Sequence, residues 1–297
     1  MQRVTNIGIT SSVLGNNQKT LSRLATYQEQ LSSGKRVNRM SDDPVAGKIA
    51  VGHRKGVFEA DKYLDNISKS SAFMQATDAT MGEMSRMLEN VKDLAVQGAN
   101  GTQDANSRTA LSQQVNALLD RMIDLGNTQH DGRYVFSGTA TAQRPFARSD
   151  DDLRVDYSGN LDDFTVQIGP SSAVVVNQNG NDLFKTSVDI FDSLVDLRDA
   201  LKNNDGPKVA TLIDRVDAAA EHVIVQHGNM GGRMQRLELA RNQLEDTQVQ
   251  LRQLMSDAED VDLTKTLTDF QLANTALEAG LQVGARVMQT SLIDFLR

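Results

Sequence analysis

Proline is unevenly spread along this chain of 297 residues, and its distribution determines where long helices can form. The four prolines leave two long proline-free stretches, Val45–Arg144 and Lys208–Arg297. Because proline removes a backbone donor and clashes with the preceding helical turn, long helices are expected inside these two stretches.

Apolar residues near both ends of the chain repeat with a narrow heptad spacing. They lie three, four or seven residues apart, which is the spacing of a coiled-coil seam. The seam residues are Leu14, Leu21, Leu24, Leu31, Leu263, Phe270, Leu277, Leu281, Met288 and Phe295. A coil of only two helices leaves part of such an apolar stripe uncovered. We therefore predict that these residues contact other subunits.

The inner part of each proline-free stretch has broader apolar stripes that predict packed helices. Asp42 and Asp43 before Pro44 are suited to begin a helix, and Asp104 is suited to begin the next one. The methionines from Met74 to Met87 recur at helical spacing, so we interpret them as ordinary core residues.

The middle of the chain changes to the period of β-strands. Apolar and polar residues alternate in Leu153–Tyr157 and again in Phe164–Ile168, with turn residues Ser158–Asn160 between them. This pattern predicts a β-hairpin formed by the two segments. Gly169–Ser172 predicts another turn and Val174–Val176 a third strand.

These elements predict a mainly α fold with a small β insert. We expect a long antiparallel helical rod, made of coiled-coil termini and a helical bundle, with a β-rich outer domain. Residues 1–40 and 260–297 are assigned to the terminal coiled-coil domain. Residues 41–138 and 187–259 are assigned to the helical rod, and residues 139–186 to the β-rich insert.

Composition limits the classes of function. The chain has 31 Lys and Arg against 39 Asp and Glu, a net charge of −8, which argues against nucleic-acid binding. No apolar run approaches the length of a membrane span. The polar N-terminus lacks the apolar core of a cleavable signal peptide, so Sec-type export is not expected.

The sequence contains no recognisable catalytic, metal or cofactor site. Cysteine is absent, and His222 and His227 are five residues apart rather than the four that place two zinc ligands on one helix face. Gly34-Lys35 lacks the other residues of a phosphate-binding loop. We therefore expect no enzyme activity, no cofactor and no metal.

Several strings of residues, in a fixed order, resemble one family. They are LSSGKRVN at Leu31–Asn38, SDDPVAG at Ser41–Gly47, DLAVQGANG at Asp93–Gly101, GRMQRLELARNQLED at Gly232–Asp246 and NTALEAGLQVGARVMQTSLIDFL at Asn274–Leu296. Together these strings resemble the terminal regions of bacterial flagellins and their relatives. The resemblance covers both helical arms.

Three details are more similar to the hook–filament junction proteins of this family (hook-associated protein type 3) than to flagellin. They are Pro44 directly after Asp42-Asp43, the string DGRYVFSG at Asp131–Gly138, and SLIDFLR at Ser291–Arg297. The resemblance implies a structural subunit that joins hook to filament and templates flagellin polymerisation. A minor or short flagellin is the alternative.

The resemblance also implies partners and a location. The partners are hook-associated protein type 1, flagellin, further copies of the chain in a ring, a chaperone that holds the C-terminal segment, and the flagellar type III export apparatus. The location is secreted and extracellular, at the hook–filament junction. An enzyme carried on a flagellin-like scaffold is an alternative of a different class. The insert Thr139–Lys185 argues against it, because this insert is short and lacks histidine. A generic coiled-coil effector would not require the ordered family strings.

Overall fold

The computed structural model describes the backbone of residues 6–149 and 152–295, and the side chains of residue 8 and of residues 11–149 and 152–286. The chain divides into two compact units. Met1–Glu59 and Thr247–Arg297 form the first unit, and Ala60–Asp246 form the second. The three-part division expected from the sequence stays a prediction.

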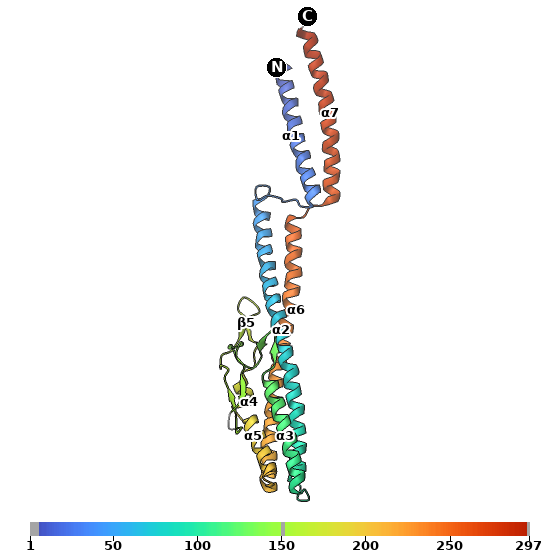
Figure 1. Cartoon of the computed structure of the whole chain (residues 1–297). Coiled ribbons are helices and arrows are strands. Elements are labelled where there is room, and N and C mark those ends of the chain that lie inside the picture. The colour runs from blue at the N-terminus through green and yellow to red at the C-terminus, as the bar shows by residue number, and fades with distance from the viewer. Residues whose placement is uncertain (1–5, 150–151, 296–297) are drawn as a thin grey trace. The chain divides into compact units, whose positions relative to one another are not determined.

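Two terminal helices form one part of the first unit. Helices α1 (Asn6–Ser33) and α7 (Leu263–Phe295) lie side by side and run in opposite directions (Figure 1). At the start of α7, the Asp262 carboxylate accepts a hydrogen bond from the backbone N–H of Lys265 at 3.0 Å. This contact caps the helix, because the first N–H groups of a helix have no partner within it. The helices predicted at both ends of the chain are confirmed.

Helix α2 (Pro44–Ala99) begins at its proline, as predicted. The Asp43 carboxylate accepts hydrogen bonds from the backbone N–H groups of Val45 and Ala46 at 3.2 and 3.0 Å. The bond from the Ala46 N–H and a hydrogen bond from Arg36 Nη1 at 3.1 Å hold the pKa of Asp43 below its usual range. The first turn of α2 is therefore capped by the acidic residue that precedes Pro44.

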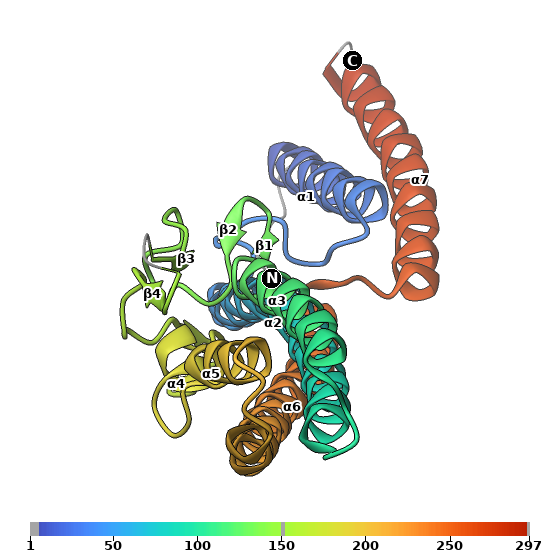
Figure 2. The same cartoon turned by 60° about the horizontal axis from the view of Figure 1, so that its bottom comes forward.

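The second unit is built around three long helical segments and two short helices. Besides parts of α2 and α6 (Gly206–Glu259), it contains α3 (Ala105–Gly126), α4 (Gly180–Phe184) and α5 (Ile190–Lys202). Asp104 caps α3, as predicted, by accepting a hydrogen bond from the Ser107 N–H at 2.7 Å. Helix α3 packs against α5, and Figure 2 shows the helices gathered in a bundle.

In the described part of the chain, three antiparallel strand pairs follow α3. Strand β1 (Gln129–His130) pairs with β2 (Arg133–Tyr134), β3 (Phe146–Arg148) with β4 (Val155–Tyr157), and β5 (Thr165–Gln167) with β6 (Ala173–Val175). The structure confirms the predicted fold class, which is mainly helical with a small β region. It also confirms the turn between residues 168 and 172.

The predicted hairpin between Leu153–Tyr157 and Phe164–Ile168 is wrong. Instead, Tyr157 pairs across the strands with Phe146, and their rings lie 5.1 Å apart. Cross-strand aromatic contacts stabilise a strand pair, and alternation alone does not specify the partner strand. The expected turn at Asn160 therefore does not join two paired strands. Instead, the Asn160 N–H donates to the Ser137 carbonyl.

Large apolar side chains form the core of the second unit. Met74, Met81 and Met84 are fully buried, so the interpretation of these methionines as core residues is confirmed. Four buried phenylalanines join the strands to the helices: Phe136, Phe146, Phe184 and Phe191. Phe146 packs so closely on α3 that a Cβ atom at Gly126 would lie 2.7 Å from its ring. Glycine at position 126 therefore permits the strands to dock.

The Tyr157 hydroxyl is half-buried in this region and lies 3.0 Å from the carbonyl oxygen of Phe136 and 2.9 Å from that of Asn160. Burial raises the pKa of Tyr157 to about 12 from its usual 10.0, because it disfavours the charged phenolate. The folded state therefore retains the phenolic proton to higher pH than the unfolded state. The contribution of the protonated Tyr157 hydroxyl to the stability of the folded state is complete below pH 10.0 and is lost as the pH rises towards about 12.

We expect the urea midpoint of the parent protein to fall between pH 10.0 and about 12 more steeply than that of Tyr157→Phe. Ultraviolet absorbance titration of both proteins checks the cause, since the difference between them isolates Tyr157. Ionisation of Tyr157 at the usual pH of an exposed tyrosine would contradict this prediction.

Candidate assembly surface

Helices α1 and α7 contact one another along one face of each helix. Asn17 lies against Gly280 and Val13 against Gly284, where a Cβ atom would be 3.3 Å from the valine side chain. Both glycines allow close approach of the two helices. Residues at the same helical spacing are also buried or half-buried. They are Val13, Asn17, Thr20, Leu24, Tyr27 and Leu31 of α1, and Thr266, Phe270, Ala273, Leu277, Gly280 and Gly284 of α7.

The predicted subunit contacts divide into two groups. Leu24, Leu31, Phe270 and Leu277 lie on the α1–α7 face. Four others are exposed, namely Leu14, Leu21, Leu263 and Leu281, by 52 to 62%. Met288 and Phe295 have side chains outside the described residues. A subunit-contact role stays a prediction for all of them.

The α1–α7 face includes residues that the sequence analysis did not select. It follows Val13, Thr20 and Tyr27, whereas the heptad pattern predicts Leu14 and Leu21. Leu24 and Leu31 belong to both the predicted seam and the observed face, so the two differ only in the alternate positions, where neighbouring residues lie about 100° apart around the helix. The small residues Gly280 and Ala273 were the available signal, because close helix packing favours small side chains at the contact.

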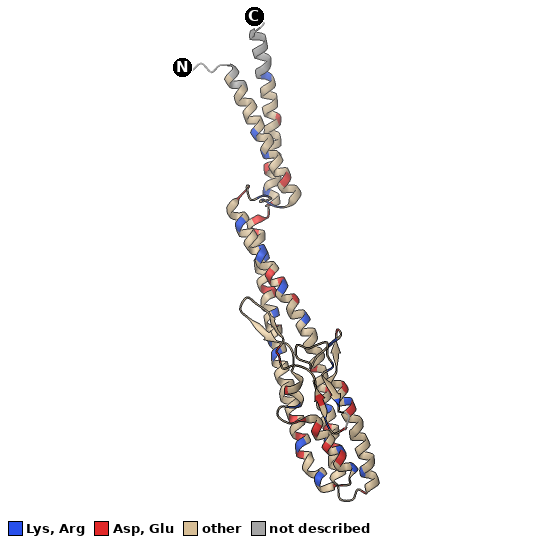
Figure 3. Ribbon diagram, turned by 60° about the vertical axis from the view of Figure 1, so that its left-hand side comes forward, with Lys and Arg blue, Asp and Glu red and all other residues tan. Residues whose placement is uncertain are grey.

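Helix α7 also exposes large apolar residues away from α1. These residues are Leu263, Leu267, Leu272, Leu281 and Val283, exposed by 49 to 64%. Figure 3 shows basic and acidic positions interspersed along the helices, so this surface is distinguished by its apolar side chains rather than by charge of one sign. A helix that is apolar on several faces is normally buried on several faces. Helix α1 covers only one of them.

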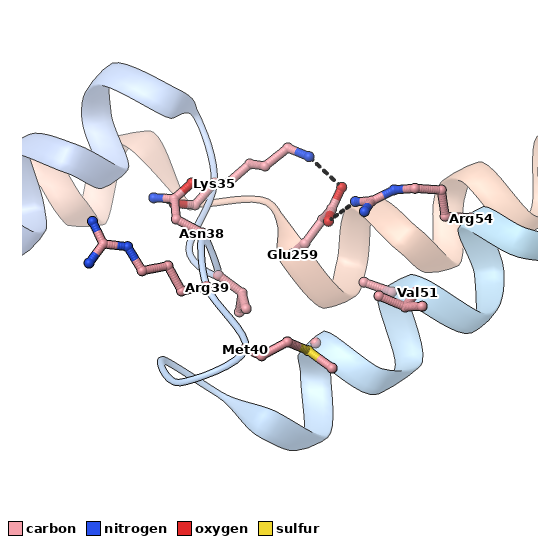
Figure 4. Close-up of a pocket in the computed structure, with 10 residues that line it drawn as sticks. Lys35, Asn38, Arg39, Met40, Val51, Arg54 and Glu259 are labelled. Carbon is pink, nitrogen blue, oxygen red and sulfur yellow. Dashed lines mark hydrogen bonds and ion pairs between the residues drawn. The ribbon is translucent and has the colours of Figure 1, made fainter.

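A buried carboxylate holds the connection between the terminal helices and the rest of the first unit. The Glu259 side chain is 7% exposed, and its two oxygens pair with Lys35 Nζ and Arg54 Nη2, both at 2.7 Å (Figure 4). The carbonyl of Glu259 accepts hydrogen bonds from the N–H groups of Arg36 and Val37. The N–H of Val261 donates to the Gly34 carbonyl at 3.1 Å. These contacts join the α1–α2 connection to the α6–α7 connection.

This junction borders a cavity of about 250 Å³ that is lined by Met40, Val51, Lys35, Arg54 and Glu259 among others (Figure 4). Of the three cations that line the cavity, Lys35 and Arg54 are paired with Glu259 and Arg39 with Glu29. The arrangement therefore serves to fix the two connections to each other. The sequence analysis did not select Glu259, because its partners lie more than 200 residues away in the chain.

We expect Glu259→Gln to weaken this junction by about 1–2 kcal/mol. The carboxylate is buried, but Lys35 and Arg54 are 40 and 57% exposed, so water screens part of the lost attraction. Amide hydrogen exchange should then accelerate at Arg36, Val37 and Val261. The matched control is Glu59→Gln, which removes an exposed pair with Lys55 and should leave those amides unchanged. Unchanged exchange in Glu259→Gln would contradict the prediction.

Among the described residues, no group of three or more His, Cys, Asp or Glu side chains is placed to hold a metal ion. His222 Nε2 contacts the Asp182 carbonyl, whereas His227 Nε2 contacts the Asp78 carboxylate. Within the same described part of the chain, no helix has the length and apolar character needed to cross a membrane.

Comparisons with known proteins show which proteins this chain is similar to. A protein named flagellar hook-associated protein 3, from Escherichia coli (strain K12), is 24% identical over 293 residues, covering 90% of this chain and 91% of that relative. Flagellin of Bacillus subtilis (strain 168) is 25% identical over 296 residues, covering 91% of this chain and 93% of the flagellin.

A solved structure has a similar fold. The flagellar junction protein FlgL from Legionella pneumophila matches with a TM-score of 0.61 at 14% identity, over 71% of this chain and 100% of that one. Two family descriptions also match: the bacterial flagellin N-terminal helical region over residues 4–141, and the bacterial flagellin C-terminal helical region over residues 213–296. Because the two regions together account for most of its length, the chain belongs to the bacterial flagellin family.

Proposed function

We propose that this chain is a structural, non-enzymatic subunit of the bacterial flagellum that forms the junction between hook and filament. The observation that carries the proposal is the exposed apolar surface of α7, which α1 covers on one face only. Such a surface requires burial by other molecules. Similarity to hook-associated protein 3 over 90% of the chain supports the junction as the place of that burial.

In this proposal, the chain forms a ring on hook-associated protein type 1 and presents a surface on which flagellin polymerises. It reaches that place through the flagellar type III export apparatus, after a chaperone has held its C-terminal segment. The exposed leucines Leu14, Leu21, Leu263 and Leu281 then contact neighbouring subunits, as do Met288 and Phe295. The absence of cysteine agrees with such export, because no disulfide has to be broken.

The second candidate function is that of a minor flagellin in the filament itself. The 25% identity to Bacillus subtilis flagellin over 91% of the chain favours it. The Asp42-Asp43-Pro44 string at the start of α2 and the DGRYVFSG string at Asp131–Gly138 favour the junction function instead.

A deletion strain distinguishes the two candidates. Electron microscopy of the cells and assay of flagellin in the medium are both needed. The junction function predicts bare hooks with flagellin lost into the medium. If filament and secreted flagellin are both missing, the chain is the filament subunit. Normal filaments would overturn the proposed function.

A further inference from the structure

A surface pocket of about 650 Å³ lies in the second unit between α2 and the strands. Its apolar lining comes from Phe73 on α2 and from Phe164, Val166 and Val176 on and beside β5 and β6. Phe164 is 42% exposed there. Asn66 fixes β5 beside α2 by donating from Nδ2 to the Gln167 carbonyl at 3.0 Å. The pocket is therefore formed by fixed elements and offers apolar surface to a side chain from outside.

The rim of this pocket carries more positive than negative charge. Lys69 and Arg133 contribute cations, and Asp131 contributes one carboxylate. Lys69 also pairs with Asp65 at 2.7 Å, but its side chain remains 75% exposed. An apolar pocket with a cationic rim favours an apolar residue with acidic neighbours.

Such a residue lies on a loop of the same unit that is close in sequence to the pocket residues of β5. Leu161 is 66% exposed and is followed by Asp162 and Asp163, both exposed. Within the described part of the chain, no hydrogen bond or ion pair is found for the Asp163 carboxylate. The loop therefore combines a large exposed apolar side chain with an available negative charge.

Hydrogen bonds to Asn160 hold this loop in one conformation. The Asn160 side chain accepts from the Thr139 N–H at 2.7 Å and donates to Asp162 at 2.9 Å. Its carbonyl accepts from Tyr157 and from Asn179 Nδ2. Gly138, with a φ of 67°, allows the backbone to pass close to Asn160. A loop that is fixed while it exposes a leucine is preorganised for binding, because little conformational entropy is lost on contact.

We propose that Leu161 of one copy inserts into this pocket of a second copy, with Asp163 facing Lys69 and Arg133. In a ring of this kind, Leu161 of each copy contacts the pocket of the next copy, which is a heterologous contact. Contacts of this heterologous kind build rings or helical assemblies. The inference rests on the proposed function, in which copies of the chain form a ring. It assigns to this loop and pocket a contact between neighbouring copies that lies outside the terminal helices.

The cysteine-free chain permits a direct test by disulfide cross-linking. Leu161→Cys and Ala72→Cys are produced together in the deletion strain, since Ala72 is exposed and lines the pocket. Oxidation of isolated flagella should give an adduct of twice the chain mass only when both variants are present. The matched control replaces Leu161→Cys by Leu153→Cys, another exposed leucine of the strand region, and should give at least about tenfold less adduct.

A photoactivatable side chain at position 161 identifies the occupant independently. An adduct of two copies, joined at the peptide that contains Phe73, supports the inference. An adduct with flagellin or another protein overturns it, as does a disulfide yield no higher than that of the Leu153→Cys control.

Charge exchange and filament formation complete the test. Asp163→Lys should reduce the disulfide adduct, and Arg133→Asp in the same chain should restore it. If wild-type chain restores filaments to the deletion strain but the cross-links fail, only the inference is wrong. If the deletion strain has normal filaments, the proposed function itself is wrong.

Discussion

Cells whose only copy of this chain carries Leu281→Asp are expected to lose their filaments, while the isolated protein remains folded. Leu281 is 56% exposed and lies off the face that contacts α1, so a charge there costs little in the isolated chain. In an assembly, the same position would lose about 1.5–3 kcal/mol of apolar burial and add the cost of desolvating a carboxylate. A ring repeats this loss at every subunit.

Swimming assays and electron microscopy measure the expected loss, and circular dichroism during heating measures the fold. The control is Gln282→Asp, which places the same charge on the adjacent exposed residue of α7. Cells with this control should retain filaments. If Leu281→Asp cells swim like the parent, Leu281 is not part of an assembly surface.

Arg108→Ala is expected to destabilise the second unit by about 3 kcal/mol. The Arg108 side chain is buried and donates from Nε to the Gly98 carbonyl at 2.8 Å and from Nη2 to the Asn100 carbonyl at 3.0 Å. It also donates from Nη1 to the Asn204 side chain at 2.6 Å. These contacts place a cation at the C-terminal end of α2, where the helix dipole favours it, and join three chain segments.

Urea unfolding followed by circular dichroism measures this effect. Arg121→Ala is the matched control, because Arg121 lies on the same helix but pairs with Glu83 at the exposed surface. Its unfolding midpoint should change little. A midpoint for Arg108→Ala equal to that of Arg121→Ala would show that the buried hydrogen bonds do not stabilise the unit.

Much of the helical framework could be predicted because its signals are local. Pro44 after two acidic residues marks the start of α2, and Asp104 caps α3. The apolar stripe through Met74 and Met81 is buried as its spacing predicts. Each of these signals depends on residues within a few turns of one another, so the sequence contains all the information needed to interpret them.

The surface residues could be predicted only in part. A heptad pattern indicates that a helix has an apolar side, but residues one position apart can both satisfy it. The structure uses Val13, Asn17 and Thr20 against α7 and leaves Leu14 and Leu21 exposed. Asn17 fits both registers, whereas the close contact of Val13 with Gly284 occurs only in the register that the structure adopts.

The sequence by itself therefore determined where the long helices lie, the apolar character of both ends and the presence of a small β region, whereas the shorter helices α4 and α5 were not predicted. Only the tertiary structure decided which segments are partners. It paired β4 with β3 rather than β5, and it brought Glu259 to Lys35 and Arg54. The physical reason is that periodicity specifies which side of an element is apolar, whereas packing, aromatic contacts and ion pairs between distant residues select what covers it.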